Sequence, residues 1–192
     1  MKNNHTWVIC AYGESEFLEA CILSLQAQTL PSKIICYSST PLDSIKQLCQ
    51  KYGIPFYTKE GGGIGKDWNN ALSFVETSYA TIAHQDDYYE PTYLEAVMQK
   101  IEQSKDILIA YTDYFEEKNG VKIPANTNLK IKTLMLKTLN LMPASRFWRN
   151  RVLAFGNPIS CPAVTYNLEA LKDFRFDEEM RVSLDWYAWY KI

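Results

Sequence analysis

No stretch of this chain approaches the roughly 20 consecutive apolar residues that a membrane-spanning helix needs. The first residues are mostly polar and lack the apolar centre of a signal peptide. None of the five cysteines forms a C-x-x-C pair, and an odd number does not suit a complete disulfide framework. These absences favour free thiols in a reducing compartment, so we expect a cytoplasmic protein.

Acidic residues are missing from one long segment, although they outnumber basic residues elsewhere. Residues 118–168 contain no Asp or Glu, and their eight basic residues are Lys118, Lys122, Lys130, Lys132, Lys137, Arg146, Arg149 and Arg151. The rest of the chain holds 12 basic and 22 acidic residues. The net charge of the whole chain is only −2, so we expect no general attraction to nucleic acid.

Strand-like and helix-like segments alternate along the first part of the chain, whose composition is that of an ordinary globular protein. Short apolar runs predict strands at Trp7–Ala11, Lys33–Tyr37, Ile54–Thr58, Tyr79–Ala83 and Ile107–Phe115. Helical spacing of apolar residues predicts helices at Glu16–Ala27, Leu42–Tyr52, Lys66–Ser78 and Pro91–Gln103. This alternation predicts an α/β fold, with a mainly parallel sheet and helices on both faces.

The alternation stops after Ile123. The pair Asn119-Gly120 predicts a hairpin turn just before that point. Beyond it we expect two helices, a short strand and a last helix, at Leu129–Leu141, Ala144–Ala154, Ala163–Tyr166 and Ser183–Ile192. The last helical pattern has no C-cap signal, so we expect a truncated chain.

Four glycines between Gly61 and Gly65 follow the third predicted strand. A phosphate-binding P-loop is excluded, because Glu60 and Asp67 stand where its first Gly and its Ser or Thr should be. A dinucleotide fingerprint is excluded because its last glycine is missing. The loop can be a flexible connector. We favour a loop whose backbone approaches an anionic ligand closely.

The segment His84-Gln85-Asp86-Asp87 follows the fourth predicted strand directly. Ligands of such sheets bind at the carboxyl ends of the strands, and Mg²⁺ and Mn²⁺ prefer carboxylate oxygens. On local sequence alone, a helix-capping turn before Pro91 is the better interpretation of the acidic pair.

Six short motifs, in the same order and at similar spacing, resemble those of family 2 glycosyltransferases. The first four lie between Trp7 and Ile101: Ala11-Tyr12-Gly13-Glu14 for "P-x-Y-N-E", Ser24–Thr29 for "S-l-l-x-Q-t", Gly63–Asn69 for "G-l-x-x-a-R-N" and His84–Asp87 for "D-x-D-D". The other two lie near the end: Phe176-Asp177-Glu178 for "F-D-E" and Asp185-Trp186 for the late "E-D-W". No single motif is decisive, but six in order are specific.

This resemblance implies a GT-A type fold, with residues 1–117 as the nucleotide-sugar-binding half and residues 118–192 as the acceptor-side half of one domain. It implies inverting transfer of a sugar from a nucleoside-diphosphate sugar to an acceptor hydroxyl. It also implies a divalent metal, Mn²⁺ or Mg²⁺, at Asp86 and Asp87, with Asp185 as the general base. The implied nucleotide-sugar-binding residues are Ala11, Tyr12, Glu14, Ser38, Lys66, Asn69, His84 and Asp86.

Several positions depart from the family pattern. His84 replaces the first acid of "D-x-D", although an imidazole can still bond hydroxyls or ligate a metal. Ser38 and Ser39 stand where the family often has Asp-Asp, one of which reads uracil. Trp68 replaces an Arg, and Leu184 replaces the Glu before the base. A UDP-sugar remains the expected donor, but these changes put that specificity in doubt.

Three functions remain open from the sequence. The first is the transferase itself, acting on a saccharide or lipid-linked acceptor, by resemblance in bacterial surface polysaccharide synthesis. The second is a nucleotide-sugar or polysaccharide binding module that has lost catalysis, which the change at His84 favours. The third is an unrelated nucleotide-binding α/β protein, which the failed P-loop and dinucleotide patterns disfavour.

The acid-free segment also carries apolar residues at helical spacing, which are Ile131, Leu134, Met135, Leu139 and Met142. Phe147 and Trp148 come next, among arginines. Basic residues beside apolar ones are typical of helices that lie on anionic lipid, so peripheral membrane contact is one hypothesis. A stripe that packs against the sheet is an equal alternative.

Overall fold

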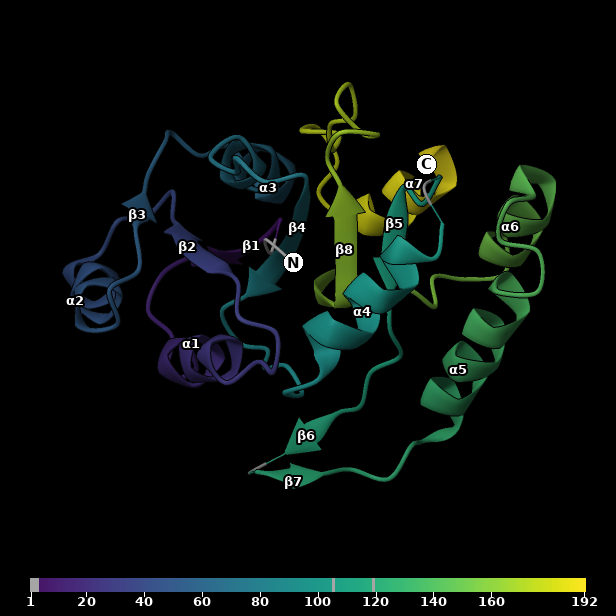
Figure 1. The fold of residues 1–192 in the computed structure, drawn as a ribbon, viewed down its shortest axis with the longest axis horizontal. Helices are drawn as coiled ribbons and strands as arrows, with labels where there is room; N and C mark the ends of the chain where they lie inside the picture. Colours follow the sequence, from purple (N-terminus) through teal and green to yellow (C-terminus); the bar gives the residue numbers. More distant parts are fainter. Residues whose placement is uncertain (1–3, 105, 119) are drawn as a thin grey trace.

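The computed structural model describes residues 4–104, 106–118 and 120–192. Its main sheet has the strand order β3-β2-β1-β4-β8-β5, which can be followed in Figure 1. These strands are β1 (His5–Cys10), β2 (Lys33–Tyr37), β3 (Phe56–Tyr57), β4 (Tyr79–His84), β5 (Ile109–Tyr111) and β8 (Val164–Asn167). Strands β3, β2, β1 and β4 are parallel, whereas β8 runs antiparallel to both of its neighbours. The expected α/β class with a mainly parallel sheet is confirmed.

Helices cover both faces of the sheet. They are α1 (Leu18–Gln26), α2 (Asp43–Lys51), α3 (Ile64–Leu72), α4 (Tyr93–Glu102), α5 (Thr127–Leu139), α6 (Arg146–Leu153) and α7 (Leu184–Lys191). Strand residues alternate between the faces. Trp7 and Ile9 pack with α1, α2 and α4, whereas Val8 packs with Ala71 of α3 on the other face. The buried strand β1 thus joins two hydrophobic layers.

Several predicted boundaries were too wide. The helix expected at Lys66–Ser78 ends at Leu72, where Ser73 donates from its hydroxyl to the Asn70 carbonyl and tight turns follow. The strand expected at Ile107–Phe115 is only β5, because Asp113 turns away and accepts a hydrogen bond from Thr133 of α5. The strand expected at Ile54–Thr58 is shorter and consists only of β3, because Pro55 has no backbone N–H to donate to a neighbouring strand.

A short hairpin, β6 (Glu117–Lys118) and β7 (Val121–Lys122), extends from the body of the fold. Of the predicted turn pair, Gly120 has a φ of 75°, and Asn119 lies outside the described residues. The pairing of β6 with β7 confirms the predicted hairpin. Among the described residues, no helix combines the length and apolar content that crossing a bilayer requires.

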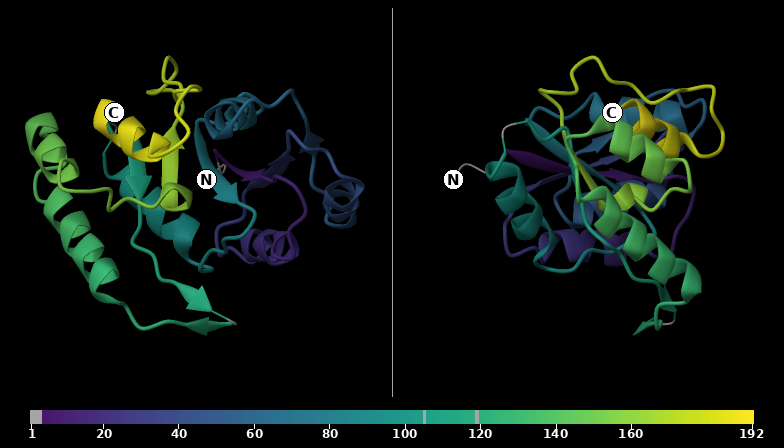
Figure 2. Two further views of the ribbon diagram at one scale, coloured as in Figure 1. Left: turned by 180° about the vertical axis from the view of Figure 1, so that it is seen from behind. Right: turned by 90° about the vertical axis from the view of Figure 1, so that its right-hand side faces the viewer.

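Helix α5 has two apolar faces, so the single predicted stripe was wrong. Leu129, Leu136 and Leu139 are buried, and the last two belong to a hydrophobic core cluster. Two residues of the predicted stripe therefore face the core, namely the buried Leu139 and the partly buried Met135. Ile131, Leu134 and Met142 instead remain exposed. Figure 2 shows α5 and α6 along one edge of the molecule, at the far side from α2.

Candidate active site

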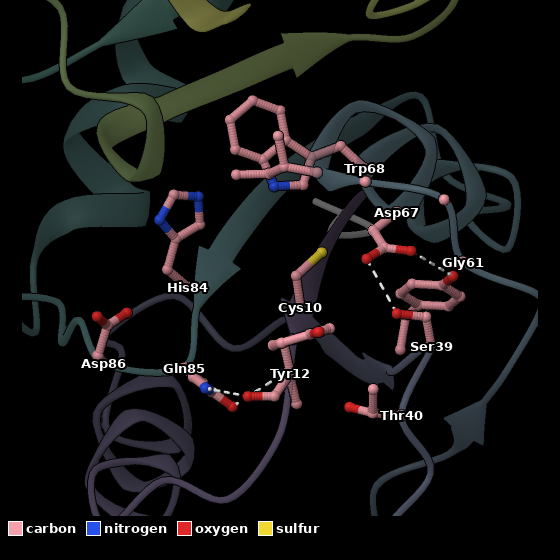
Figure 3. Close-up of a pocket in the computed structure, with 15 residues that line it drawn as sticks. Cys10, Tyr12, Ser39, Thr40, Gly61, Asp67, Trp68, His84, Gln85 and Asp86 are labelled. Carbon is pink, nitrogen blue, oxygen red and sulfur yellow. Dashed lines mark hydrogen bonds between the residues drawn. The ribbon is translucent and has the colours of Figure 1, made fainter. Parts of the chain in front are cut away.

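The main pocket lies where β1, β2 and β4 end, so it opens at the carboxyl edge of the parallel strands. Its volume is about 590 Å³. The lining residues are Cys10, Ala11, Tyr12, Tyr37, Ser39, Thr40, Gly61, Gly62, Gly63, Ile64, Asp67, Trp68, His84, Gln85 and Asp86. Figure 3 shows His84 and Asp86 at one side of this pocket and Asp67 with Ser39 at the other. The strand-end loops singled out by the sequence therefore share one rim.

At the end of the pocket that lies beside the end of β4, a cluster of potential metal ligands is formed by His84, Asp86 and Asp87. One ligand atom from each lies within 4.8 Å of the others. The His84 Nδ1 atom is 3.8 Å from an Asp87 carboxylate oxygen. Among the described residues, the buried His84 Nε2 atom has no hydrogen-bond partner. Two carboxylates and an imidazole are a donor set that suits Mn²⁺, and also Mg²⁺ through its oxygens.

The protonation of this cluster follows from its burial. Burial lowers the pKa of the His84 imidazole, against the opposing charges of Asp86 and Asp185. The ring is therefore neutral near pH 7 and can ligate a cation. Burial, with the adjacent Asp86 charge, raises the pKa of Asp87 to about 6. Trp68 stacks on His84 with ring centroids 5.5 Å apart and fixes the imidazole plane.

At the opposite end of the pocket, two hydroxyl groups donate hydrogen bonds to the carboxylate of Asp67. Ser39 Oγ donates to one oxygen at 2.9 Å, and the Tyr37 hydroxyl donates to the other at 3.2 Å. Burial raises the pKa of Tyr37, so its hydroxyl remains a donor. Sequence reasoning missed Asp67, treating it only as a failed P-loop position. Its position as the fourth residue of α3, the helix that follows the glycine loop, was the available signal.

Tyr12 and Ala11 line the pocket as expected. The Tyr12 backbone is bound on both sides by the Gln85 side chain. Gln85 accepts from the Tyr12 N–H at 3.1 Å and donates to its carbonyl at 2.8 Å. The Tyr12 ring remains 67% exposed. Gln85 thus ties the end of β1 to the end of β4 and leaves an aromatic face free for a ligand.

Six of the predicted site residues are not among those that line the pocket: Glu14, Ser38, Lys66, Asn69, Asp87 and Asp185. Ser38 is fully buried, and its hydroxyl accepts from the Thr40 backbone N–H. Ser39 and Thr40 line the pocket instead. Glu14 is exposed outside the lining residues. A strand end alternates its side chains, which moves the exposed hydroxyls one residue along from Ser38.

The side chains of Asn69 and Lys66 form contacts that the sequence did not predict. The Asn69 amide donates to the Phe176 carbonyl and accepts from the Phe176 N–H, both at 2.9 Å. It also donates to Glu178, so it joins the glycine-loop motif to the Phe176–Glu178 motif. The aliphatic stem of Lys66 packs over Gly62, behind the pocket lining.

Close approach of the chain explains two of the glycines. A Cβ at Gly65 would lie 2.5 Å from the Asp177 carbonyl oxygen. A Cβ at Gly61 would lie 2.7 Å from the Ser39 Cβ. Protein packing therefore requires both residues, while Gly61 and Gly63 also border the pocket. Close approach of the loop to an anionic ligand stays a prediction, and packing within the chain is a separate reason for these two glycines.

Asp185 lies in the first turn of α7. Asn157 donates to one of its carboxylate oxygens at 2.7 Å. Asp185 does not line the pocket itself, but its charge opposes the lowering of the His84 pKa, so the two side chains interact. A carboxylate that is oriented by a hydrogen bond at one oxygen is suited to accept a proton at the other. Sequence reasoning did not identify Asn157.

Comparisons with known proteins identify the family of this chain. The family model described as "Glycosyl transferase family 2" matches residues 6–161. The protein "Glycosyltransferase GlyA" of Streptococcus pneumoniae serotype 4 is 24% identical over 123 residues, which cover 60% of this chain and 18% of that protein.

Two solved structures have similar folds. S. aureus TarS 1-349 in complex with UDP has a TM-score of 0.68 at 19% identity, over 96% of this chain and 53% of that chain. The mannosyltransferase PcManGT from Pyrobaculum calidifontis, in complex with GDP-Man and Mn²⁺, has a TM-score of 0.65 at 12% identity. That match covers 92% of this chain and 48% of the other. The chain thus spans about half the length of these structures.

Proposed function

Because this chain belongs to glycosyl transferase family 2, we propose that it moves a sugar from a nucleoside-diphosphate sugar to an acceptor hydroxyl, with inversion at the anomeric carbon. The observation that carries the proposal is one pocket with two different polar ends. A cluster of metal ligands stands at one end, and a hydrogen-bonded carboxylate stands at the other. A nucleotide sugar needs both, one for its diphosphate and one for its base.

The His84–Asp87 end fits a divalent cation, Mn²⁺ or Mg²⁺, by the chemistry of its donor atoms. Such a cation offsets the negative charge that develops on a diphosphate leaving group. Asp86 and Asp87 would hold it through oxygen, and His84 through nitrogen. Lys66, in the first turn of α3, adds a positive charge beside the glycine loop.

Asp185 is the proposed general base. Deprotonation of the acceptor hydroxyl must coincide with attack on the anomeric carbon, and a positioned carboxylate supplies that proton acceptor. Asn157 holds one oxygen of Asp185 at 2.7 Å, which leaves the other for the acceptor. The side chain of Asn157 therefore positions the base without touching the reacting atoms.

A UDP-sugar is the proposed donor. The Asp67 carboxylate can accept a hydrogen bond from a ring N–H, which uracil has and cytosine lacks at the same position. Guanine presents two N–H groups side by side. Both Asp67 oxygens already accept hydroxyl hydrogen bonds, so one further donor fits better than two. The exposed ring of Tyr12 would stack on the base.

For the acceptor, we propose a saccharide or a lipid-linked saccharide in bacterial surface polysaccharide synthesis. One similar protein is a bacterial glycosyltransferase, which supports a bacterial setting. The five cysteines are free thiols, which supports a cytoplasmic compartment. The chain spans less than a fifth of that relative, so acceptor choice depends on any further residues of the whole protein.

Release of the nucleotide leaving group, which is UDP, GDP, dTDP or CMP from the corresponding nucleotide sugar, tests the proposal when it is measured with Mn²⁺ and with EDTA. We expect Mn²⁺-dependent release of UDP and little release from the GDP- and CMP-sugars. Donor binding without any turnover, with every acceptor tried, would favour the binding module that has lost catalysis. Neither binding nor turnover would contradict the proposed function.

A further inference from the structure

A second face of α5 carries apolar side chains that remain exposed in the described part of the chain. On a helix, residues three, four and seven positions apart share a face. Lys130, Leu134 and Lys137 therefore lie on one face, opposite the buried Leu129 and Leu136. Leu134 is 64% exposed, and the adjoining Ile131 is 52% exposed. A two-faced helix of this kind packs on the core with one side and presents apolar groups to its surroundings with the other.

Exposed apolar side chains also occur between Leu141 and Phe155, and we call the exposed residues of the range 127–155 the α5–α6 flank. Beyond α5, its large exposed apolar side chains are Leu141, Met142, Phe147 and Phe155, with Phe147 73% and Phe155 87% exposed. Single exposed apolar residues are ordinary, but a gathering of them marks an interaction site. Figures 1 and 2 place both helices along one edge of the molecule.

The cations of the flank divide into two groups. Lys132 donates to the Tyr114 hydroxyl, and Arg149 donates to the carbonyl oxygens of Pro143 and Ile192, so both serve the fold. The other four are exposed and form no ion pair with any acid in the described part of the chain: Lys130, Lys137, Arg146 and Arg151.

Charge on the rest of the protein is of the opposite sign. No Asp or Glu occurs in residues 118–168, while the remainder has 22 acidic and 12 basic residues. A negatively charged surface would attract the α5–α6 flank and repel the remainder. The charge distribution therefore favours a partner that is negatively charged, extended and able to take up apolar side chains.

We propose that the α5–α6 flank binds the surface of an anionic lipid bilayer. Exposed leucine and phenylalanine side chains enter the boundary between headgroups and acyl chains, while the four unpaired cations meet anionic headgroups. The inference goes beyond the proposed sugar transfer and does not depend on it. Binding to vesicles requires neither donor nor acceptor.

Co-sedimentation with vesicles of phosphatidylcholine, with and without 30% phosphatidylglycerol, tests the proposal at low and high salt. We expect binding to the anionic vesicles at low salt, and its loss at high salt or on neutral vesicles. No binding at low salt, or equal recovery on both vesicle types, would overturn the proposal.

Matched variants locate the surface. Lys130→Gln with Lys137→Gln should weaken binding to anionic vesicles about 25-fold, because each cation near such a surface contributes about fivefold. Leu134→Gln should weaken it through loss of apolar contact. Lys100→Gln with Lys172→Gln, two exposed lysines elsewhere, should leave binding nearly unchanged. All these side chains are exposed, so the variants should fold.

An equal loss in the Lys100 and Lys172 control would overturn the proposal, because the attraction would then not belong to the flank. Light scattering after gel filtration supplies a further check. If the protein self-associates and Leu134→Gln abolishes that association without altering vesicle binding, the flank is an interface between two copies and the proposal is wrong.

Discussion

The polar groups at the two ends of the pocket differ in their hydrogen-bond partners. We call the His84–Asp87 end, where a metal is proposed to bind, the metal end. We call the Asp67 end, where the nucleobase is proposed to bind, the base end. At the metal end, His84 Nε2 has no partner among the described residues, and two carboxylates crowd beside it. At the base end, Ser39 and Tyr37 already bond both oxygens of Asp67. Crowded carboxylates cost free energy until a cation offsets their charge. The His84–Asp87 end therefore keeps repulsion between neighbouring carboxylates, whereas the carboxylate at the Asp67 end is already hydrogen-bonded.

The largest expected effect comes from removing the metal end. Asp86→Ala should abolish turnover and the effect of Mn²⁺ on UDP binding, because the cluster loses an oxygen ligand. Binding of UDP without metal should survive, since Asp67 is unchanged. Calorimetric titration of UDP with and without Mn²⁺ measures both. Glu102→Ala, which removes an exposed acid at the end of α4, is the control. An unchanged Mn²⁺ effect in Asp86→Ala would remove this residue from the metal site.

The next effect separates the chemical step from donor binding. Asp185→Asn should slow sugar transfer by ~10²-fold or more, the order expected for loss of a general base. The substituted amide can still accept from Asn157, so the local structure should persist. Donor affinity should be nearly normal by calorimetry. Near-normal transfer rates would move the role to another acid, with Asp177 the first to examine.

A smaller effect is expected at the base end. Asp67→Asn keeps the shape of the side chain but removes its charge, so UDP should bind about 10-fold or more weakly, as expected for losing a hydrogen bond to a charged group. The ratio of affinities with and without Mn²⁺ should stay constant. Asp43→Asn, at an exposed site in α2, is the matched control. If Asp67→Asn instead altered the Mn²⁺ effect alone, the two ends would be assigned in reverse.

The smallest effect concerns the choice of metal. Imidazole nitrogen suits Mn²⁺ better than Mg²⁺, which prefers oxygen. His84→Asp should therefore shift the ratio of Mn²⁺ to Mg²⁺ affinity several-fold toward Mg²⁺. Coupling of ¹⁴N to bound Mn²⁺ in electron paramagnetic resonance should be present in the wild type and absent in the variant. No such coupling in the wild type would show that His84 is not a ligand.

The contrast between the two ends also explains what the sequence could predict. His84, Asp86 and Asp87 are near one another in the chain, so one strand and one loop bring them together. The base end joins Tyr37 and Ser39 after β2 to Asp67 in α3, about thirty residues apart. Local periodicity predicts the strands and helices but not which side chains meet across them.

The same reason accounts for the errors in the second half. Strand β8 enters the sheet between β4 and β5, far from either in sequence, and alternation of strands and helices along the first part does not predict this insertion. The predicted stripe on α5 combined apolar residues that occur on two faces of the helix. The role of Asn69 depends on residues 107 positions away, beyond any local pattern.

The central claim is that a nucleoside diphosphate lies across the pocket, with its phosphates at the His84–Asp87 end and its base at Asp67. A crystal structure of the protein with UDP and Mn²⁺ tests it most directly. The account predicts Mn²⁺ bound by Asp86, uracil stacked on Tyr12, and the uracil ring N–H within hydrogen-bond distance of the Asp67 carboxylate. UDP bound with its base beside His84, or outside this pocket, would contradict the account.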